Sequence, residues 1–150
     1  MTALAFTAVS ALAAPDTLPD ASKLPPAATQ SGLTFDKDIH PIFDEACVGC
    51  HGEKRQRAML RLDTLDGVMK GSKDHKEIVV PGDSSKSRLV FAVANIDGKV
   101  FMPPKPRAPR PPMNGATNAP TPPPPPQHPW KPLTTEQVAL IRAWVDQGAK

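Results

Sequence analysis

The sequence predicts a small, mostly α-helical domain, and three observations lead to this fold class. Apolar residues recur at helical spacing in residues 34–46. A second helical pattern, with start and stop signals at its ends, occupies residues 133–148. Fourteen of the 20 prolines lie in residues 103–132, which can form neither a regular helix nor a central strand. We therefore expect one helical domain over residues 34–150, with a long proline-rich loop before its last helix.

The first helix is predicted to start near Thr34, because Phe35, Ile39 and Ile42 follow at helical spacing. Pro41 has no backbone N–H, so it must lie near the first turn and the regular part must be short. This helix leads the chain directly into the segment that contains its cysteines.

Beyond that segment, Gly52 permits a tight turn, and the polar residues 53–57 are expected to form an exposed loop. A brief apolar cluster follows, and after it a helix of one or two turns that ends at Gly71. The cluster comprises Leu60, Leu62 and Leu65.

A third helix is predicted to be capped by Asp83 or Ser84 and to end near Ala94. Its inward-facing residues are expected to be Leu89, Val90 and Val93. Residues 101–104 should be extended, because a residue before proline is pushed out of the α region.

The last helix has the clearest local signals. Thr134 is placed as the N-cap, Gln137 completes a capping box, and Leu133 can pack on Val138 as a hydrophobic staple. Gly148 stands where a C-terminal cap is expected. The apolar stripe of this helix comprises Val138, Ile141, Trp144 and Val145.

The chain's two cysteines lie in one motif, Cys47-Val48-Gly49-Cys50-His51. This is the attachment pattern of c-type haem. Two intervening residues let both sulfurs reach the two vinyl groups of one porphyrin, each forming a thioether bond. The next residue then lies under the iron, where an imidazole is a good axial ligand. We expect one covalent haem c, held by Cys47, Cys50 and His51.

Three other interpretations of the motif remain open. A structural zinc site usually needs four ligands, but the chain has one cysteine pair and scattered histidines. A thioredoxin-like redox pair would follow a buried strand, which residues 43–46 do not resemble. A disulfide between Cys47 and Cys50 would leave His51 without a purpose.

The composition agrees with a bound apolar group and argues against a nucleic-acid partner. The chain has no Tyr, two Trp and five Phe, which would make a thin protein core. A haem inside the domain would supply a large apolar plate. The net charge of +3 is mild, and no basic–aromatic pattern typical of nucleic-acid binding is present.

The N-terminal segment resembles the end of a secretory signal peptide. Residues 1–14 form a short apolar run with small residues at a plausible cleavage point after Ala13 or Ala14, although a basic start is missing. The run is too short to span a bilayer, and residues 15–33 have the composition of a linker. Because bacteria attach haem covalently outside the cytoplasm, we expect a periplasmic or otherwise exported protein without a membrane span in its mature form.

The iron needs either a second axial ligand or an open site on its other face. Met102 is favoured because it lies far enough beyond His51 to reach the opposite face, and because the prolines after it stiffen the backbone. It also precedes the last helix. The other candidates are Met59, Met69, Met113, His40, His75 and His128.

Together these pieces resemble the small cytochrome c domain known as planctomycete cytochrome C, over roughly residues 34–149. The matching segments are Asp38 to Phe43, Cys47 to Gly52, Leu60 to Asp63, Val80 to Asp83, Ser87 to Leu89, Met102 to Pro104, Leu133 to Glu136 and Trp144 to Ala149. The resemblance implies a cytochrome c-like helical fold, with His51 as proximal and Met102 as distal ligand. The proline-rich insert is longer than the family's usual link at that point.

The function predicted from these residues is electron transfer by a single-haem carrier with redox partner proteins, not an enzyme. Basic residues after the motif and after Met102 could steer acidic partners, or could be ordinary solvated charges. They are Lys54, Arg55, Arg57, Arg61, Lys105, Arg107 and Arg110. One alternative is a haem enzyme or gas sensor with an open distal site. The other is an interaction module in which the haem is structural and the proline-rich loop, otherwise expected to be a spacer, docks a partner.

Overall fold

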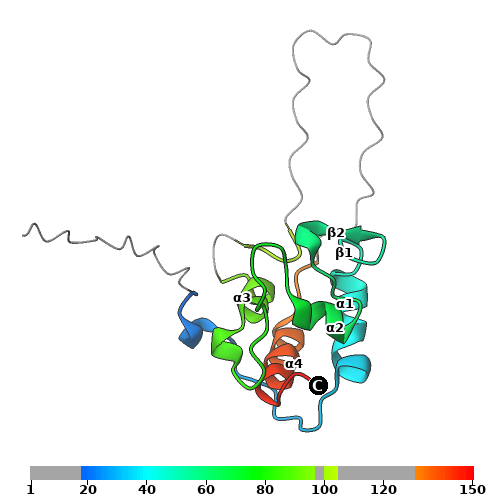
Figure 1. Cartoon of the computed structure of the whole chain (residues 1–150). Helices are drawn as coiled ribbons and strands as arrows, with labels where there is room; N and C mark the ends of the chain where they lie inside the picture. The colour runs from blue at the N-terminus through cyan, green and yellow to red at the C-terminus, as the bar shows by residue number, and fades with distance from the viewer. Residues whose placement is uncertain (1–17, 97–99, 105–130) are drawn as a thin grey trace, which may run out of the picture.

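The computed structural model describes residues 18–96, 100–104 and 131–150. Within these ranges the chain forms four α-helices and one small antiparallel sheet (Figure 1). The helices are α1 (His40–Ala46), α2 (Leu65–Lys70), α3 (Arg88–Ala94) and α4 (Thr135–Asp146). The strands are β1 (His51–Gly52) and β2 (Arg55–Gln56), and the shorter helical turns are η1 (Ala21–Lys23), η2 (Phe35–Ile39), η3 (Arg57–Met59) and η4 (Ser84–Lys86). The prediction of a mostly α-helical fold is confirmed.

The first helix starts where the spacing predicted, and it accommodates Pro41 by changing type. The wide π-helical turn η2 precedes α1, and His40 N–H donates to the carbonyl of Phe35, five residues back. Pro41 then occupies the first turn of α1, where its missing N–H costs no bond within α1 itself. Phe35, Ile39 and Phe43 are all buried on one side of this continuous segment.

The last helix, α4, is built as the sequence predicted. Gln137 N–H donates to Thr134 Oγ1 at 3.3 Å, and Thr134 N–H donates to Gln137 Oε1 at 2.9 Å, which completes the capping box. At the other end, Gly148 has φ +99° and its N–H donates to the carbonyl of Val145. Ala149 N–H donates to the carbonyl of Trp144, so the helix ends in a Schellman motif.

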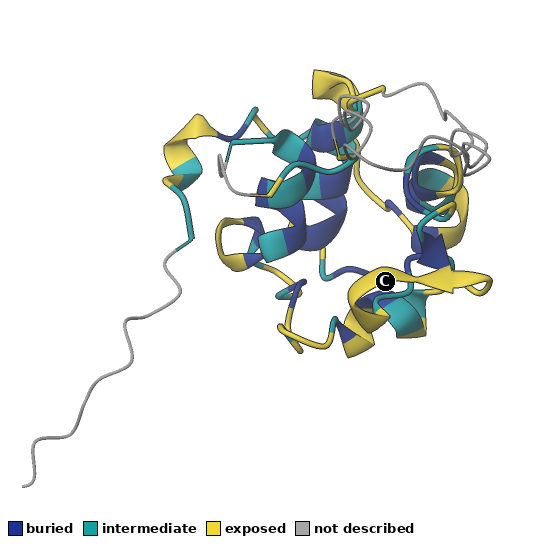
Figure 2. Cartoon of the chain, turned by 90° about the horizontal axis from the view of Figure 1, so that it is seen from above, coloured by how far each residue is buried: buried dark blue, intermediate teal, exposed yellow. Residues whose placement is uncertain are grey.

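The two ends of the domain meet beside α4. The carbonyl of Lys150 accepts from Phe35 N–H at 2.7 Å and from Trp144 Nε1–H at 3.0 Å. The rings of Phe35 and Trp144 lie 6.0 Å apart, and both residues are buried. Figure 2 shows the buried residues gathered on the inward faces of the helices, with exposed residues outside them. The segment that leads to the cysteine motif is therefore fixed against α4.

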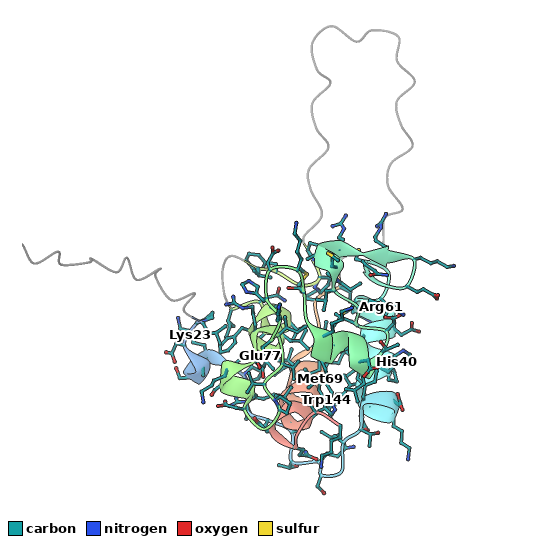
Figure 3. All side chains as sticks on the ribbon, in the orientation of Figure 1. Lys23, His40, Arg61, Met69, Glu77 and Trp144 are labelled. Atoms are coloured by element: carbon teal, nitrogen blue, oxygen red, sulfur yellow. The ribbon has the colours of Figure 1, made fainter. Side chains whose placement is uncertain are left out.

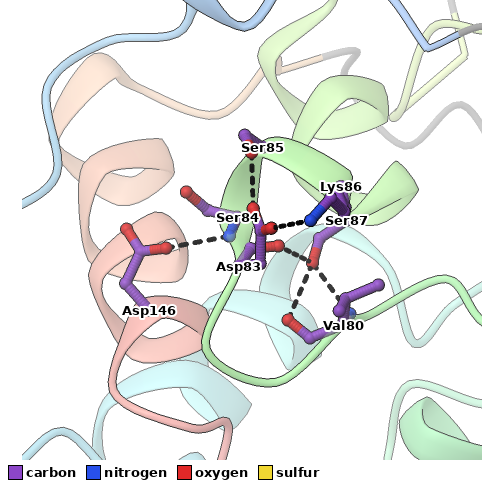
Figure 4. Close-up of polar contacts among 7 residues, drawn as sticks. All are labelled: Val80, Asp83, Ser84, Ser85, Lys86, Ser87 and Asp146. Atoms are coloured by element: carbon purple, nitrogen blue, oxygen red, sulfur yellow. Dashed lines mark hydrogen bonds and ion pairs between the residues drawn. The ribbon is translucent and has the colours of Figure 1, made fainter.

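The turn before α3 is also fixed to α4 (Figure 4). The hydroxyl of the fully buried Ser87 donates to the carbonyl of Asp83 at 2.8 Å and accepts from Val80 N–H at 2.8 Å. Ser84 N–H donates to Asp146 Oδ1 at 2.8 Å. These bonds keep residues 84–86 as a separate helical turn, so the predicted start of the third helix is wrong and α3 begins at Arg88. The predicted inward residues of α3 are buried, and Phe91 is buried as well.

Candidate functional site

The cysteine motif forms one tight turn at the end of α1. Cys47 N–H donates to the carbonyl of Phe43, and the Cys47 carbonyl accepts from Cys50 N–H at 3.0 Å and from His51 N–H at 2.9 Å. Both cysteines are free thiols in this structure. Burial raises the pKa of Cys47 to about 12, with the neighbouring Cys50 acting in the same direction, so Cys47 stays protonated at neutral pH. Two thiols and an imidazole therefore come from a single turn of backbone.

His51 is buried and held at three points. Its N–H bonds to Cys47, and its carbonyl accepts from Leu62 N–H at 2.7 Å. Its ring Nδ1 lies 3.1 Å from the carbonyl oxygen of Arg57. Because a carbonyl only accepts, Nδ1 carries the proton, and Nε2 is the nitrogen that could bind a metal.

The ionisation state of His51 suits a metal ligand. Burial lowers the pKa of the imidazole, and the nearby carbonyls of Arg57 and Leu60 only partly oppose this effect. The ring is therefore neutral at physiological pH, as metal coordination requires. Two thiols, one oriented neutral imidazole and the spacing between them fit a covalent haem.

The chain leaves the motif as a short hairpin rather than as the predicted loop. His51 pairs with Gln56 and Gly52 pairs with Arg55, so the exposed tip is Glu53-Lys54. A Cβ at Gly52 would lie 2.7 Å from both the carbonyl oxygen and Cγ1 of Val48. The tight exit predicted at Gly52 is thus confirmed, and it depends on the missing side chain.

The return from the hairpin contains two strained residues. Ala58 has φ +55° and Met59 has φ +56°, a left-handed conformation that non-glycine residues rarely adopt. This bend follows Arg57 and precedes Leu62, the residues whose carbonyl and N–H hold His51. The sequence did not identify Arg57 as part of the site, because every residue has a carbonyl and no side-chain pattern reveals which one is used.

Met102 lies on a different element from the motif. It is partly buried, and its N–H donates to Asn95 Oδ1 at 3.0 Å and to the carbonyl of Ala92 at 3.3 Å. The backbone bends at Met102 and Pro103 instead of running straight as predicted. Figure 1 shows residues 100–104 crossing the end of the molecule where the β1–β2 hairpin lies.

The other candidate ligands lie elsewhere or outside the described residues. His40 opens α1, one helix length of about 10 Å from the motif, and its ring packs 5.7 Å from that of Phe35. In Figure 3, His40 and Met69 both lie away from the hairpin. The side chain of Met59 is 68% exposed, and this residue lies in η3, directly after the hairpin that begins at His51. His75 lies in a loop where its N–H donates to Ser72, and Met113 and His128 fall outside the described residues.

Two surface hollows flank this end of the molecule. The larger, of about 420 Å³, lies beside the motif turn and is lined by Val48, Gly49 and charged residues. The smaller, of about 290 Å³, lies between the end of α3 and the start of α4. Its lining includes Asn95, the residue bonded to Met102, and apolar residues such as Val93, Leu133 and Val138. The smaller hollow is thus the one that adjoins the Met102 segment.

Two further findings concern a metal site built from several side chains and a membrane-spanning helix. The described part of the chain holds no group of three or more His, Cys, Asp or Glu side chains that could bind a metal ion. Among the same residues, no helix has both the length and the apolar character needed to cross a bilayer.

Residues 47–106 match the family model described as Planctomycete cytochrome C. The matched segment covers less than half of the chain, begins at Cys47 and includes Met102. The predicted resemblance is therefore confirmed in this segment, and the match supports a c-type cytochrome involved in electron transfer rather than an enzyme. Comparisons with the curated proteins and with the solved structures gave no significant match.

Proposed function

We propose that this chain, which matches a cytochrome family over residues 47–106, is a single-haem electron carrier with His51 and Met102 as axial ligands. The observation that carries the proposal is the 3.1 Å contact between His51 Nδ1 and the Arg57 carbonyl oxygen. It leaves Nε2 for a metal and fixes the plane of the ring beside two free thiols.

Each residue has a separate task in this proposal. The Cys47 and Cys50 thiols would hold haem through two thioether bonds, each S–H adding across one vinyl group with its sulfur on one carbon and its proton on the other. His51 would offer its Nε2 lone pair from a ring that cannot rotate while Nδ1 is bonded. Met102 supplies a thioether from the segment tied to α3. When bound, haem with one histidine and one methionine ligand would supply one-electron transfer, at a higher reduction potential than haem with two histidine ligands.

The exposed cations beside the motif fit a carrier that meets acidic redox partners. Lys54 and Arg55 are exposed on the hairpin that contains His51, and the exposed Arg57 directly follows it in η3. Arg61 instead forms an ion pair with Asp63 at 2.6 Å, so it contributes little to the surrounding field. Lys105, Arg107 and Arg110 lie outside the described residues. We further propose that haem is attached outside the cytoplasm, with residues 1–14 as the remnant of an export signal.

The attachment chemistry is tested by protein matured in a bacterial periplasm. Haem should remain on the polypeptide through acid–acetone extraction and denaturing electrophoresis, and it should be lost in the Cys47→Ser, Cys50→Ser double variant. Haem extracted into the solvent from the wild-type protein would contradict the covalent attachment.

The carrier function is tested on the same protein by spectroscopy. The ferric haem should be low-spin, with a weak methionine–iron band at the red end of the spectrum. It should bind carbon monoxide poorly when reduced. A high-spin ferric spectrum would instead indicate the open distal site of an enzyme or a gas sensor.

A further inference from the structure

Helix α3 ends on a residue with an unusual combination of contacts. Asn95 has φ +56° and ψ +32°, and its backbone N–H donates to the carbonyl of Ala92 at 3.3 Å. Its side-chain Nδ2 donates to the carbonyl of Val93 at 3.3 Å. α3 itself is firmly seated, because Leu89, Val90, Phe91 and Val93 are buried in the core. Both the backbone and the side chain of Asn95 are therefore bonded to the end of a helix that is itself packed in the core.

The same side chain bonds to the segment that contains Met102. Asn95 Oδ1 accepts from Met102 N–H at 3.0 Å, and the Ala92 carbonyl accepts from the same N–H at 3.3 Å. This N–H is the last one before two prolines, since Pro103 and Pro104 have none to donate. Between residues 102 and 104, the backbone thus has one donor, and that donor is bonded to the end of α3.

Few residues could replace Asn95 in both roles. The left-handed conformation favours Gly, Asn or Asp, because a short polar side chain tolerates it. Of these, glycine offers no acceptor to Met102, and aspartate offers an acceptor but no donor to Val93. The sequence therefore contains a helix-ending residue that is also matched to the Met102 N–H.

We propose that Asn95 is a positioning residue that holds the Met102 backbone where its thioether can bind the haem iron. The proposal rests on the function proposed above. Asn95 acts through Met102 and does not itself touch the metal. Without this acceptor, the Met102 N–H loses its shorter bond and keeps the longer one to the Ala92 carbonyl, so an added ligand can displace the thioether more easily.

Two substitutions at Asn95 separate positioning from support of the fold. Asn95→Gly keeps an easy left-handed end for α3 but removes the acceptor. Asn95→Asp keeps the acceptor but places a carboxylate at the C-terminal end of a helix, which is unfavourable. If Asn95 positions Met102, the Asn95→Gly variant should hold Met102 more loosely while the stability of the fold is kept. The Asn95→Asp variant should keep Met102 bound while the stability of the fold falls.

The experiment uses the haem-loaded proteins with imidazole as the competing ligand. Asn95→Gly should raise the affinity of the ferric protein for imidazole roughly three- to tenfold, the value of one lost hydrogen bond. Asn95→Asp should stay within about twofold of the wild type. Independently of ligand binding, amide hydrogen exchange at Met102 in the ferrous protein should be faster in Asn95→Gly and unchanged in Asn95→Asp. Urea unfolding of each variant measures the fold.

Met102→Ala, measured in parallel, distinguishes the possible failures. If Met102→Ala raises imidazole affinity but Asn95→Gly behaves as the wild type, Met102 is a ligand and the positioning role is wrong. If imidazole affinity simply follows urea stability in both Asn95 variants, Asn95 has only a structural role and the inference is overturned. If Met102→Ala leaves imidazole affinity unchanged, Met102 is not a ligand, and both the ligation and its positioning by Asn95 fail.

Discussion

The carbonyl oxygen of Arg57 lies 3.1 Å from Nδ1 of His51, so the chain orients this imidazole by itself. Arg57 directly follows strand β2, so this bond joins the end of the hairpin to its first residue. A few residues later, the Leu62 N–H donates to the His51 carbonyl. A ring held in this way presents Nε2 in one direction.

His51→Ala should abolish the low-spin haem spectrum, whereas His40→Ala should retain it. The motif places His51 directly beside Cys50, one of the two cysteines proposed to attach haem, while His40 packs on Phe35 at the start of α1. Optical and electron paramagnetic resonance spectra of the ferric proteins provide the measurement. His75→Ala and His128→Ala serve as further controls, and loss of the low-spin signal in any control variant would indicate bis-histidine ligation.

Met102→Ala should give a largely high-spin ferric haem that binds cyanide readily, because the sixth position is then open. Met102→His should stay low-spin with a lower reduction potential, since imidazole favours ferric iron more than a thioether does. Redox titration with optical detection checks both. Met113→Ala is the control. If that variant opens the site while Met102→Ala does not, the ligand belongs to the proline-rich insert.

Gly52→Ala should destabilise the haem-loaded protein by about 1–3 kcal/mol, the usual effect of forcing atoms into a filled space. The new Cβ would lie 2.7 Å from the carbonyl oxygen of Val48, which belongs to the cysteine motif, and Gly52 itself directly follows His51. Urea denaturation measures the change. Adding Val48→Ala should not restore stability, because the carbonyl remains; a full rescue would mean that only the Val48 side chain matters.

The sequence was sufficient where a local pattern determines the structure. The α4 capping box and the glycine that ends this helix depend on neighbouring residues only, and both are found as predicted. The spacing of Phe35 and Ile39 likewise located the first helix, although the π-helical turn that accommodates Pro41 depends on the geometry of that one proline.

The sequence was insufficient where backbone groups meet across a loop. Two-residue strands contain too few side chains to show an alternating pattern, so the hairpin after Gly52 was missed. The left-handed bend at Ala58 has no compositional signal, because alanine ordinarily avoids it. Asn95 did carry a signal, since asparagine after an apolar helix is a common helix end. Its bond to Met102 depends on tertiary structure.

Ala58→Gly should stabilise the protein by about 0.5–1 kcal/mol, because glycine removes left-handed strain that exceeds its own entropic cost. Ala58 is exposed, so the substitution loses little packing. Ala139→Gly, inside α4, is the matched control and should destabilise by about 1 kcal/mol. Equal destabilisation by both substitutions, measured by urea unfolding, would show that the bend at Ala58 carries no strain.

Asp63 should make the stability of the wild type fall in acid. Its hydrogen bond with Arg61 lowers the pKa of the carboxyl from its ordinary value. A carboxyl whose pKa is lower in the folded protein stabilises the fold at any pH above its pKa in the unfolded chain. This contribution is lost as the pH falls through the pKa of the folded protein. Asp63→Asn should therefore be less stable near neutral pH and should lose less stability below a pH of about 4. Parallel pH profiles for the two proteins would contradict this role.

The hairpin also offers a place to attach the protein to a surface. Its tip, Glu53-Lys54, is exposed, while the pairing of His51 with Gln56 closes the loop behind it. Lengthening such a loop costs only about 0.6 kcal/mol for each doubling. A linker inserted between these two residues would therefore leave the bonds at His51 in place. It would connect the proposed haem to an electrode with only Gly52 and Glu53 between His51 and the linker.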